Sequence, residues 1–112
     1  MSKRSSQKLL TNGARTLKFL RKQTGLSFRA AAAVSGVGDG VINHLEHGRI
    51  QIHPRHLEKL LSAYGATAKT YEMFAMGSVP LPEDVRFECL EMIRMMSLDQ
   101  LRTAYPVLAS LA

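Results

Sequence analysis

The chain has 112 residues, of which 46% are hydrophobic and 21% charged, and its formal net charge is +6. This length allows one domain, or one domain with an appendage, and this composition excludes a disordered chain. No apolar run approaches the roughly 18 residues of a membrane helix, and residues 1–22 lack the apolar stretch of a secretory signal. A single cysteine, Cys89, excludes an internal disulfide and is compatible with a reducing cytoplasm.

The positive charge is concentrated in the first third of the chain. Residues 1–38 contain eight basic side chains and no acidic one, whereas residues 79–112 contain three basic and five acidic side chains. Such a basic region suits a polyanion, although basic arms can also serve only to keep a protein soluble. We predict a basic arm at residues 1–11, in which Lys3 and Arg4 follow a DNA backbone or enter a minor groove.

The first helix is predicted to run from residue 12 to about residue 24, with Asn12 as its cap. The following segment, residues 25–48, is typical of two short helices joined by a tight glycine turn. Ser27 is a good N-cap for a helix over residues 28–35, because its hydroxyl can accept from the free N–H groups of the first turn.

The chain is expected to reverse at Gly36, because glycine adopts the left-handed conformation without a Cβ clash. A second short helix then runs from Gly38 or Asp39 to His47. Small or apolar residues stand where the two helices would cross, namely Ala32, Val37, Ile42 and Leu45. Two helices joined in this way form a helix-turn-helix, whose second helix enters the DNA major groove.

Two further helices complete a predicted first domain at residues 12–77. Pro54 suits the first turn of one helix, because its missing N–H costs nothing there, and Gly65 ends that helix. Thr67 is expected to cap the other, which ends near residue 77. The segment 78–82 contains two prolines and is predicted to be a linker.

The C-terminal segment, residues 83–112, is predicted to form two apolar helices. Pro82 and the acidic residues after it open the first of them. A capping-box pattern at Ser97 to Gln100 starts the second, which Pro106 is expected to kink or end. The predicted fold class is therefore all-α, with a five-helix bundle followed by two C-terminal helices.

Two helices of this kind are too few to form a core of their own. They must pack on the first domain, on a second copy of the chain or on another protein, since exposed apolar patches of this size mark interfaces. We expect a homodimer through residues 83–112, because a two-fold dimer can read both halves of a palindromic DNA site. The alternative is that both helices fold back onto their own bundle.

The order and spacing of these signals resemble the XRE family, the lambda-repressor-like or Cro-like helix-turn-helix domains. The resemblance covers roughly residues 12–76. It rests on Leu20-Arg21, Gly25-Leu26-Ser27, Ala32, Gly36-Val37, Ile42, Glu46, Gly48-Arg49, Pro54, Leu57, Leu60-Leu61 and Gly65. It implies a bacterial or phage DNA-binding protein with double-stranded DNA as its partner. It also implies that Glu46 pairs with Arg21, a pair worth about 0–1 kcal/mol if it lies on the surface.

By position in the motif, the start of the second helix of the helix-turn-helix faces base edges. Asn43 could then pair bidentately with adenine, and His44 could donate or accept at a base edge or a phosphate. Arg49 and Ser27 would hold phosphates. The expected DNA-binding residues are Ser27, Gly38, Asp39, Gly40, Asn43, His44 and Arg49, together with Lys3 and Arg4 of the arm.

Three residues depart from the family pattern and leave a sparse recognition surface. Phe28 stands where the family often has a polar residue that contacts the DNA backbone, so it is expected to pack on the bundle or on a partner. Gly40 offers no side chain and weakens its helix by roughly 1 kcal/mol relative to alanine. Asp39 brings a negative charge towards phosphates, and we expect it to be an N-cap rather than a reader of cytosine.

Metal binding and catalysis are not expected. His44 and His47 are three residues apart, as are His53 and His56, but zinc sites usually supply four ligands and Cys89 is distant in sequence. The sequence has no phosphate-cradling glycine loop and no paired carboxylates in a predicted cleft, so we expect no cofactor and no enzymatic activity. We predict a dimeric cytoplasmic transcriptional regulator, such as a repressor. The alternative is an antitoxin-like or adaptor protein whose C-terminal helices bind a different protein.

Overall fold

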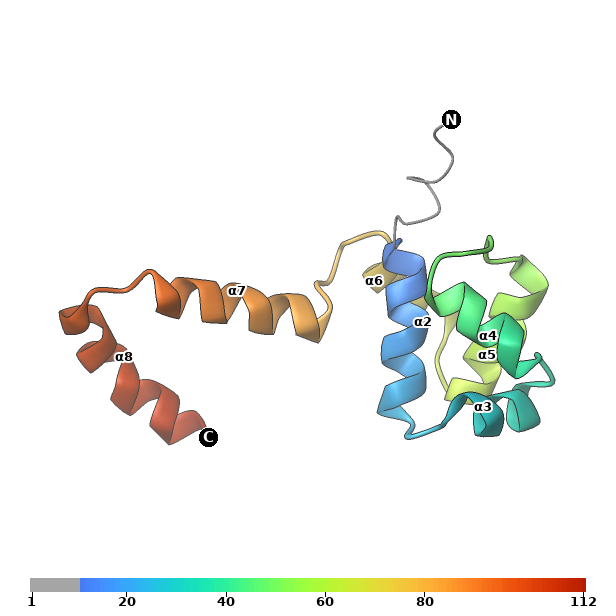
Figure 1. Ribbon diagram of the computed structural model, residues 1–112, viewed down its shortest axis with the longest axis horizontal. Coiled ribbons are helices and arrows are strands. Elements are labelled where there is room, and N and C mark those ends of the chain that lie inside the picture. The colour runs from blue at the N-terminus through green and yellow to red at the C-terminus, as the bar shows by residue number, and fades with distance from the viewer. Residues whose placement is uncertain (1–10) are drawn as a thin grey trace, which may run out of the picture. The chain divides into compact units, whose positions relative to one another are not determined.

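Helices account for all regular secondary structure in residues 11–112, the part of the chain that the computed structural model describes. Seven helices lie in this range, and the chain divides into a first unit that ends at residue 79 and a second unit over residues 80–112 (Figure 1). The prediction of an all-α fold, with five helices before the linker and two after it, is confirmed.

Helix α2 (Asn12–Gln23) opens the first unit, and its cap is Thr11 rather than Asn12. The hydroxyl of Thr11 accepts from the backbone N–H of Ala14 at 3.1 Å. Asn12 is already the first helical residue, and its side-chain oxygen accepts from Arg15 at 3.3 Å. The sequence prediction missed the cap by one residue because threonine and asparagine both cap helices well.

The helix-turn-helix consists of α3 (Phe28–Ser35) and α4 (Asp39–Glu46). Ser27 caps α3 as predicted, since its hydroxyl accepts from the N–H of Ala30 at 3.0 Å. Gly36 ends α3 with φ +82°, the left-handed conformation that its place in the turn requires.

The cap of α4 differs from the expected one. Gly38 is the N-cap and makes no side-chain hydrogen bond, while Asp39 is the first helical residue. The prediction that Asp39 caps this helix is therefore wrong by one position. In the first turn the Asp39 carboxylate still lies near the positive end of the helix dipole, where a negative charge is stabilising.

The core of the first unit lies where α2, α3, α4 and α5 (Pro54–Tyr64) meet. Its buried members are Leu17, Leu20, Ala31, Val37, Ile42, Leu45, Leu60, Leu61 and Tyr64. Ala31 is fully buried, whereas Ala32, which the sequence placed at the helix crossing, is only partly buried against the same core. The three apolar residues expected on one side of the motif, Val37, Ile42 and Leu45, are all buried.

Helix α6 (Ala68–Ala75) packs along α2 and closes the first unit. Thr67 caps it as predicted and accepts from the N–H of Thr70 at 3.1 Å. The rings of Phe19 and Phe74 meet edge to face with their centroids 5.4 Å apart. At the start of α2, a Cβ placed on Gly13 would lie 2.5 Å from the hydroxyl of Tyr71. At Gly13, therefore, α2 leaves no room for a side chain beside Tyr71 of α6.

The second unit contains α7 (Pro82–Arg94) and α8 (Leu98–Leu111). Ser97 and Gln100 form the predicted capping box at the start of α8. The expectation that Pro106 could end this helix is wrong, because α8 continues to Leu111. The carbonyl that Pro106 leaves without an N–H partner belongs to Arg102, an exposed residue, so water can satisfy it.

Neither α7 nor α8 contains a buried residue. Their largest apolar side chains are exposed, including Phe87 at 61%, Met95 at 82% and Tyr105 at 72%. An apolar groove of about 490 Å³ runs between the two helices, with Met92 and Leu108 among its lining residues. The second unit thus presents the kind of surface that a folded protein normally covers.

Candidate nucleic-acid interface

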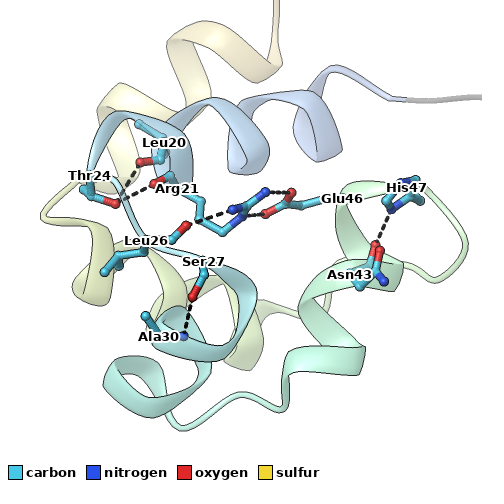
Figure 2. A network of polar contacts seen from close by, with 9 residues as sticks. All are labelled: Leu20, Arg21, Thr24, Leu26, Ser27, Ala30, Asn43, Glu46 and His47. Atoms are coloured by element: carbon cyan, nitrogen blue, oxygen red, sulfur yellow. Dashed lines mark hydrogen bonds and ion pairs between the residues drawn. The ribbon is translucent and has the colours of Figure 1, made fainter.

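A buried ion pair fixes the position of α4 against α2. The Arg21 guanidinium binds the Glu46 carboxylate through two hydrogen bonds of 2.7 and 2.9 Å, and a third bond of 2.8 Å reaches the carbonyl of Leu26 (Figure 2). The side chains of Arg21 and Glu46 are only 8% and 1% exposed. The pair that the XRE resemblance implied is present, but it is not the surface pair for which a small contribution was expected.

Phe28 covers this ion pair. The guanidinium carbon of Arg21 lies 4.1 Å from the centre of the Phe28 ring, in a cation–π contact. Phe28 also packs against the core of the first unit. The departure from the polar residue common in the family therefore has a structural use, since the ring helps to shield the ion pair from water.

The hydrogen bond to Glu46 is the main cause of a raised Arg21 pKa, so the guanidinium stays charged. Tyr64 is also close enough to respond to this pair. Burial, together with the negative charge of Glu46, raises the pKa of Tyr64 to about 12. The Tyr64 hydroxyl is buried and makes no hydrogen bond to any residue in the described range 11–112. These groups hold the helix-turn-helix together behind the surface that α4 presents.

The beginning of α4 is exposed and almost free of side chains. Gly38, Asp39 and Gly40 are all exposed. A Cβ on Gly40 would meet no atom within 4 Å, and Gly40 has no positive φ. Packing and backbone geometry therefore do not require glycine at this position. Its effect is that no side chain projects from the start of α4.

Asn43 is only partly exposed. Its side-chain oxygen is buried and accepts no hydrogen bond from the described part of the chain. Its backbone oxygen accepts from both the N–H and the ring Nδ1 of His47, at 3.1 and 2.8 Å (Figure 2). Bidentate pairing with adenine uses both polar atoms of the asparagine amide. The Asn43 side chain would therefore have to turn outward before it could read a base.

Arg49 and His44, by contrast, are already exposed and adjacent. The backbone N–H of Arg49 donates to the carbonyl of His44 at 2.9 Å, which folds the arginine back towards α4. Its guanidinium Nη1 lies 3.4 Å from the Nδ1 of His44. The structure thus brings together two of the residues that the sequence assigned to DNA.

The remaining predicted contacts lie apart from this pair. Ser27 is exposed, but its hydroxyl already accepts from the first turn of α3. Its hydroxyl hydrogen and the neighbouring backbone remain available to a phosphate. Lys3 and Arg4 lie outside the described residues.

His47 is a surface residue that the sequence analysis discussed only as a possible metal ligand. It is exposed and stands four residues after Asn43 and three after His44, so all three lie on neighbouring parts of one helix surface. That spacing was the signal available in the sequence. Residues 11–112 contain no cluster of three or more histidine, cysteine or acidic side chains that could hold a metal ion.

A family model described as a helix-turn-helix domain matches residues 14–71, slightly more than half of the chain. No curated protein and no solved structure matches the chain significantly. The matched range begins in α2 and ends in α6, so it contains the buried ion pair and all of α3, α4 and α5. Among the helices of residues 11–112, none has the length and apolar character that crossing a membrane requires.

Proposed function

The chain belongs to the helix-turn-helix domain family, and from this premise we propose that it is a dimeric transcriptional regulator of XRE type that binds double-stranded DNA. The main support for this proposal is the way in which α4 is held. The Arg21–Glu46 ion pair holds this helix by its buried side, which leaves the opposite side, with Gly40, His44 and His47, exposed. A short helix anchored in this way can enter a major groove as a rigid element.

The charges around α4 support DNA as the ligand. The helices that pack against it, α2 and α3, contain five basic side chains and no acidic one, namely Arg15, Lys18, Arg21, Lys22 and Arg29. Arg21 is used internally, but Lys18, Lys22 and Arg29 are exposed. Arg49 adds a charge at the C-terminal end of α4, where a phosphate contact would fix the register of the helix in the groove.

Within this proposal, Asn43 reads a base after its side chain turns. The buried amide oxygen has no hydrogen-bond partner among residues 11–112, and a buried polar atom without a partner costs about 1–3 kcal/mol of stability. Turning outward to a base would therefore relieve a cost rather than break a bond.

The exposed apolar surface of α7 and α8 supports the dimerisation that we propose. A second copy of the same two helices would cover that surface and would place two copies of α4 for the halves of a palindromic site. The cytoplasm is the compartment in which such a regulator acts, and catalysis is not part of the proposed role.

One observation favours a second candidate function, an antitoxin-like or adaptor role with weak DNA binding. Gly38 and Gly40 bring no side chain to the recognition surface, and Asp39 brings a negative charge. A protein that relies mainly on α7 and α8 to bind a different protein would tolerate these residues. Such a protein would stay partly aggregated or unstable until its partner is supplied.

The deciding experiment is selection of bound duplexes from a random pool by the full chain, followed by binding measurements on the selected duplex. Affinity should fall steeply between roughly 50 and 200 mM salt, because each neutralised phosphate releases counterion. Asn43→Ala should cost about 1–3 kcal/mol on the selected duplex and little on random DNA. Arg49→Ala should weaken binding to both alike.

The matched control is Arg86→Ala, which removes an exposed arginine of α7 and should leave DNA affinity unchanged at equal dimer concentration. Absence of salt-dependent binding by the folded, full chain would refute the regulator and leave the adaptor role. Equal losses on selected and random DNA for Asn43→Ala would show that Asn43 reads no base.

A further inference from the structure

We propose that His44 and His47 form a proton-sensitive pair of base readers on α4, with opposite hydrogen-bond roles when neutral. The proposal rests on the proposed DNA-binding function and adds to it the residues and the chemistry of recognition. It also predicts that the preferred DNA sequence changes with pH.

Two histidines provide the exposed side chains on one side of α4. Gly40 and His44 lie in α4 and His47 is its C-cap, and their i, i+4 and i+7 spacing places them along one exposed side of this helix and its C-terminal end. Gly40 contributes no side chain to this face, and the Asn43 amide oxygen is turned inward. An α4 that enters a groove by this face therefore meets the bases first through imidazole rings.

The contacts of His47 fix which of its ring nitrogens carries the proton. Its Nδ1 lies 2.8 Å from the backbone oxygen of Asn43 (Figure 2). A carbonyl oxygen can only accept, so Nδ1 must be protonated to make this bond. In the neutral ring, Nε2 is then an acceptor, and it is the nitrogen left available to a ligand.

His44 has the opposite arrangement. Its Nδ1 lies 3.4 Å from Nη1 of Arg49, and a guanidinium can only donate. In the neutral ring Nδ1 therefore accepts, and Nε2–H is the donor left for a ligand. Protonation of Nδ1 would remove this acceptor and place two positive charges side by side, which would release Arg49 for a phosphate.

These roles translate into a base preference. A donor in the major groove finds acceptors at N7 and O6 of guanine, whereas an acceptor finds the amino groups of cytosine N4 or adenine N6. Neutral His44 therefore favours guanine, and neutral His47 favours cytosine or adenine. Once protonated, His47 donates from both nitrogens, so its preference should change to guanine.

The charged side chains near the pair are mostly basic and bring little negative charge to it. The charged side chains of α2 and α3, which pack against α4, are Arg15, Lys18, Arg21, Lys22 and Arg29, all of them basic. On and beside α4, Glu46 is bound to Arg21, Asp39 lies at the other end of the helix, and Arg49 is positive. DNA would supply the negative charge that favours the imidazolium.

The test compares the full chain with the double variant His44→Gln/His47→Gln at pH 6 and pH 8, at fixed salt. Glutamine keeps an amide near the position of Nε2 but does not titrate. The matched control is His53→Asn, because His53 is an exposed histidine whose ring caps α5 and asparagine is a good cap. Duplexes are selected from a random pool at each pH, and the affinity for the pH 8 pool and the pH 6 pool is measured.

Wild type and His53→Asn should bind duplex DNA about tenfold or more tightly at pH 6, a change of about 1.4 kcal/mol or more. The double variant should change less than about twofold, because it lacks the two imidazole rings of the proposed pair. The selected sequences should differ at one position, with cytosine or adenine at pH 8 and guanine at pH 6. Long-range ¹⁵N–¹H spectra of the free protein at pH 8 should show the Nδ1–H tautomer for His47 and the Nε2–H tautomer for His44.

Two results would overturn the histidine pair while leaving the regulator intact. One is salt-dependent DNA binding in which the double variant keeps the full pH dependence. The other is the same tautomer for both rings, or the same selected sequence at both pH values. Absence of DNA binding at either pH and at low salt would overturn the proposed function and the histidine pair together.

Discussion

Tyr64 is buried in the core, yet its hydroxyl forms no hydrogen bond with the residues that the structure describes. A buried hydroxyl without a partner costs about 1–3 kcal/mol relative to its hydration in water. We therefore expect Tyr64→Phe to raise the free energy of unfolding at pH 7, by about 1 kcal/mol. Urea unfolding followed by circular dichroism would measure it, with Tyr105→Phe as the exposed control that should change nothing. A less stable Tyr64→Phe variant would mean that the hydroxyl is hydrogen-bonded after all.

Tyr64→Phe should also reduce the loss of unfolding free energy that occurs as the pH rises above 10. Burial raises the pKa of Tyr64 to about 12 in the folded protein, against about 10 for an ordinary tyrosine. Because the fold favours the neutral phenol, this stabilisation is fully present below pH 10 and is lost as pH rises through 12. Over that window wild type should lose on the order of 1–3 kcal/mol more than Tyr64→Phe. Parallel profiles between pH 9 and 12 would contradict the raised pKa.

Glu46 neutralises the positive charge of Arg21, which is buried away from water. Removing one partner of a buried ion pair is expected to cost about 3–5 kcal/mol, because it leaves the other charge buried and unpaired. Glu46→Ala should therefore unfold much of the first unit, whereas Glu58→Ala, an exposed glutamate of α5, should change stability by less than about 0.5 kcal/mol. A double variant, Arg21→Met/Glu46→Leu, should recover most of the loss, since it leaves no charge behind. Equal losses of stability in the single and double variants would show that the pair stabilises the fold through its packing and not through its charges.

The contact between α2 and α6 depends on the missing side chain of Gly13. Its substitution by alanine would place a Cβ 2.5 Å from the Tyr71 hydroxyl and 3.2 Å from Cδ1 of Ile52. We expect Gly13→Ala to lose about 1–3 kcal/mol of stability through this overpacking. In a Tyr71→Phe background the nearest ring carbon would be 3.7 Å away, an ordinary contact, so the loss should shrink or reverse. A double-mutant cycle by urea unfolding checks this, and additive effects would mean that the hydroxyl is not the obstacle.

The elements that the sequence predicted well are those with local signals. Ser27 and Gly36 mark the two ends of α3 through a cap and a left-handed turn, and both signals depend only on neighbouring residues. The burial of Arg21 and Glu46 could not be read in this way, because it depends on Phe28 and on residues distant in sequence. The inward turn of the Asn43 amide has the same origin, so the site residues were located more reliably than their orientations.

The second unit has an apolar surface that no other described part of the unit covers. Helices α7 and α8 bury no residue. Leu108 lines two apolar grooves between them, the one described above and a second that Leu101 and Tyr105 also line. We expect the full chain to be a dimer by light scattering, and Leu108→Glu to be a monomer, because a charge in a dimer interface must be desolvated without a partner. Ser110→Glu is the control, since it adds the same charge at an exposed position of α8 outside both grooves.

Truncation after Val79, where the first unit ends, should give a folded monomer, since residues 12–76 contain every member of the buried cluster of the first unit. DNA affinity of the truncated chain should fall by roughly 10²–10⁴, because one half-site gains nothing from the effective concentration that links two. Leu108→Glu should reduce DNA affinity by a similar factor, although this variant retains α7 and α8. A dimeric truncated chain would move the interface into the first unit. A monomeric full chain that binds DNA as well as the truncated one would mean that α7 and α8 meet a different protein.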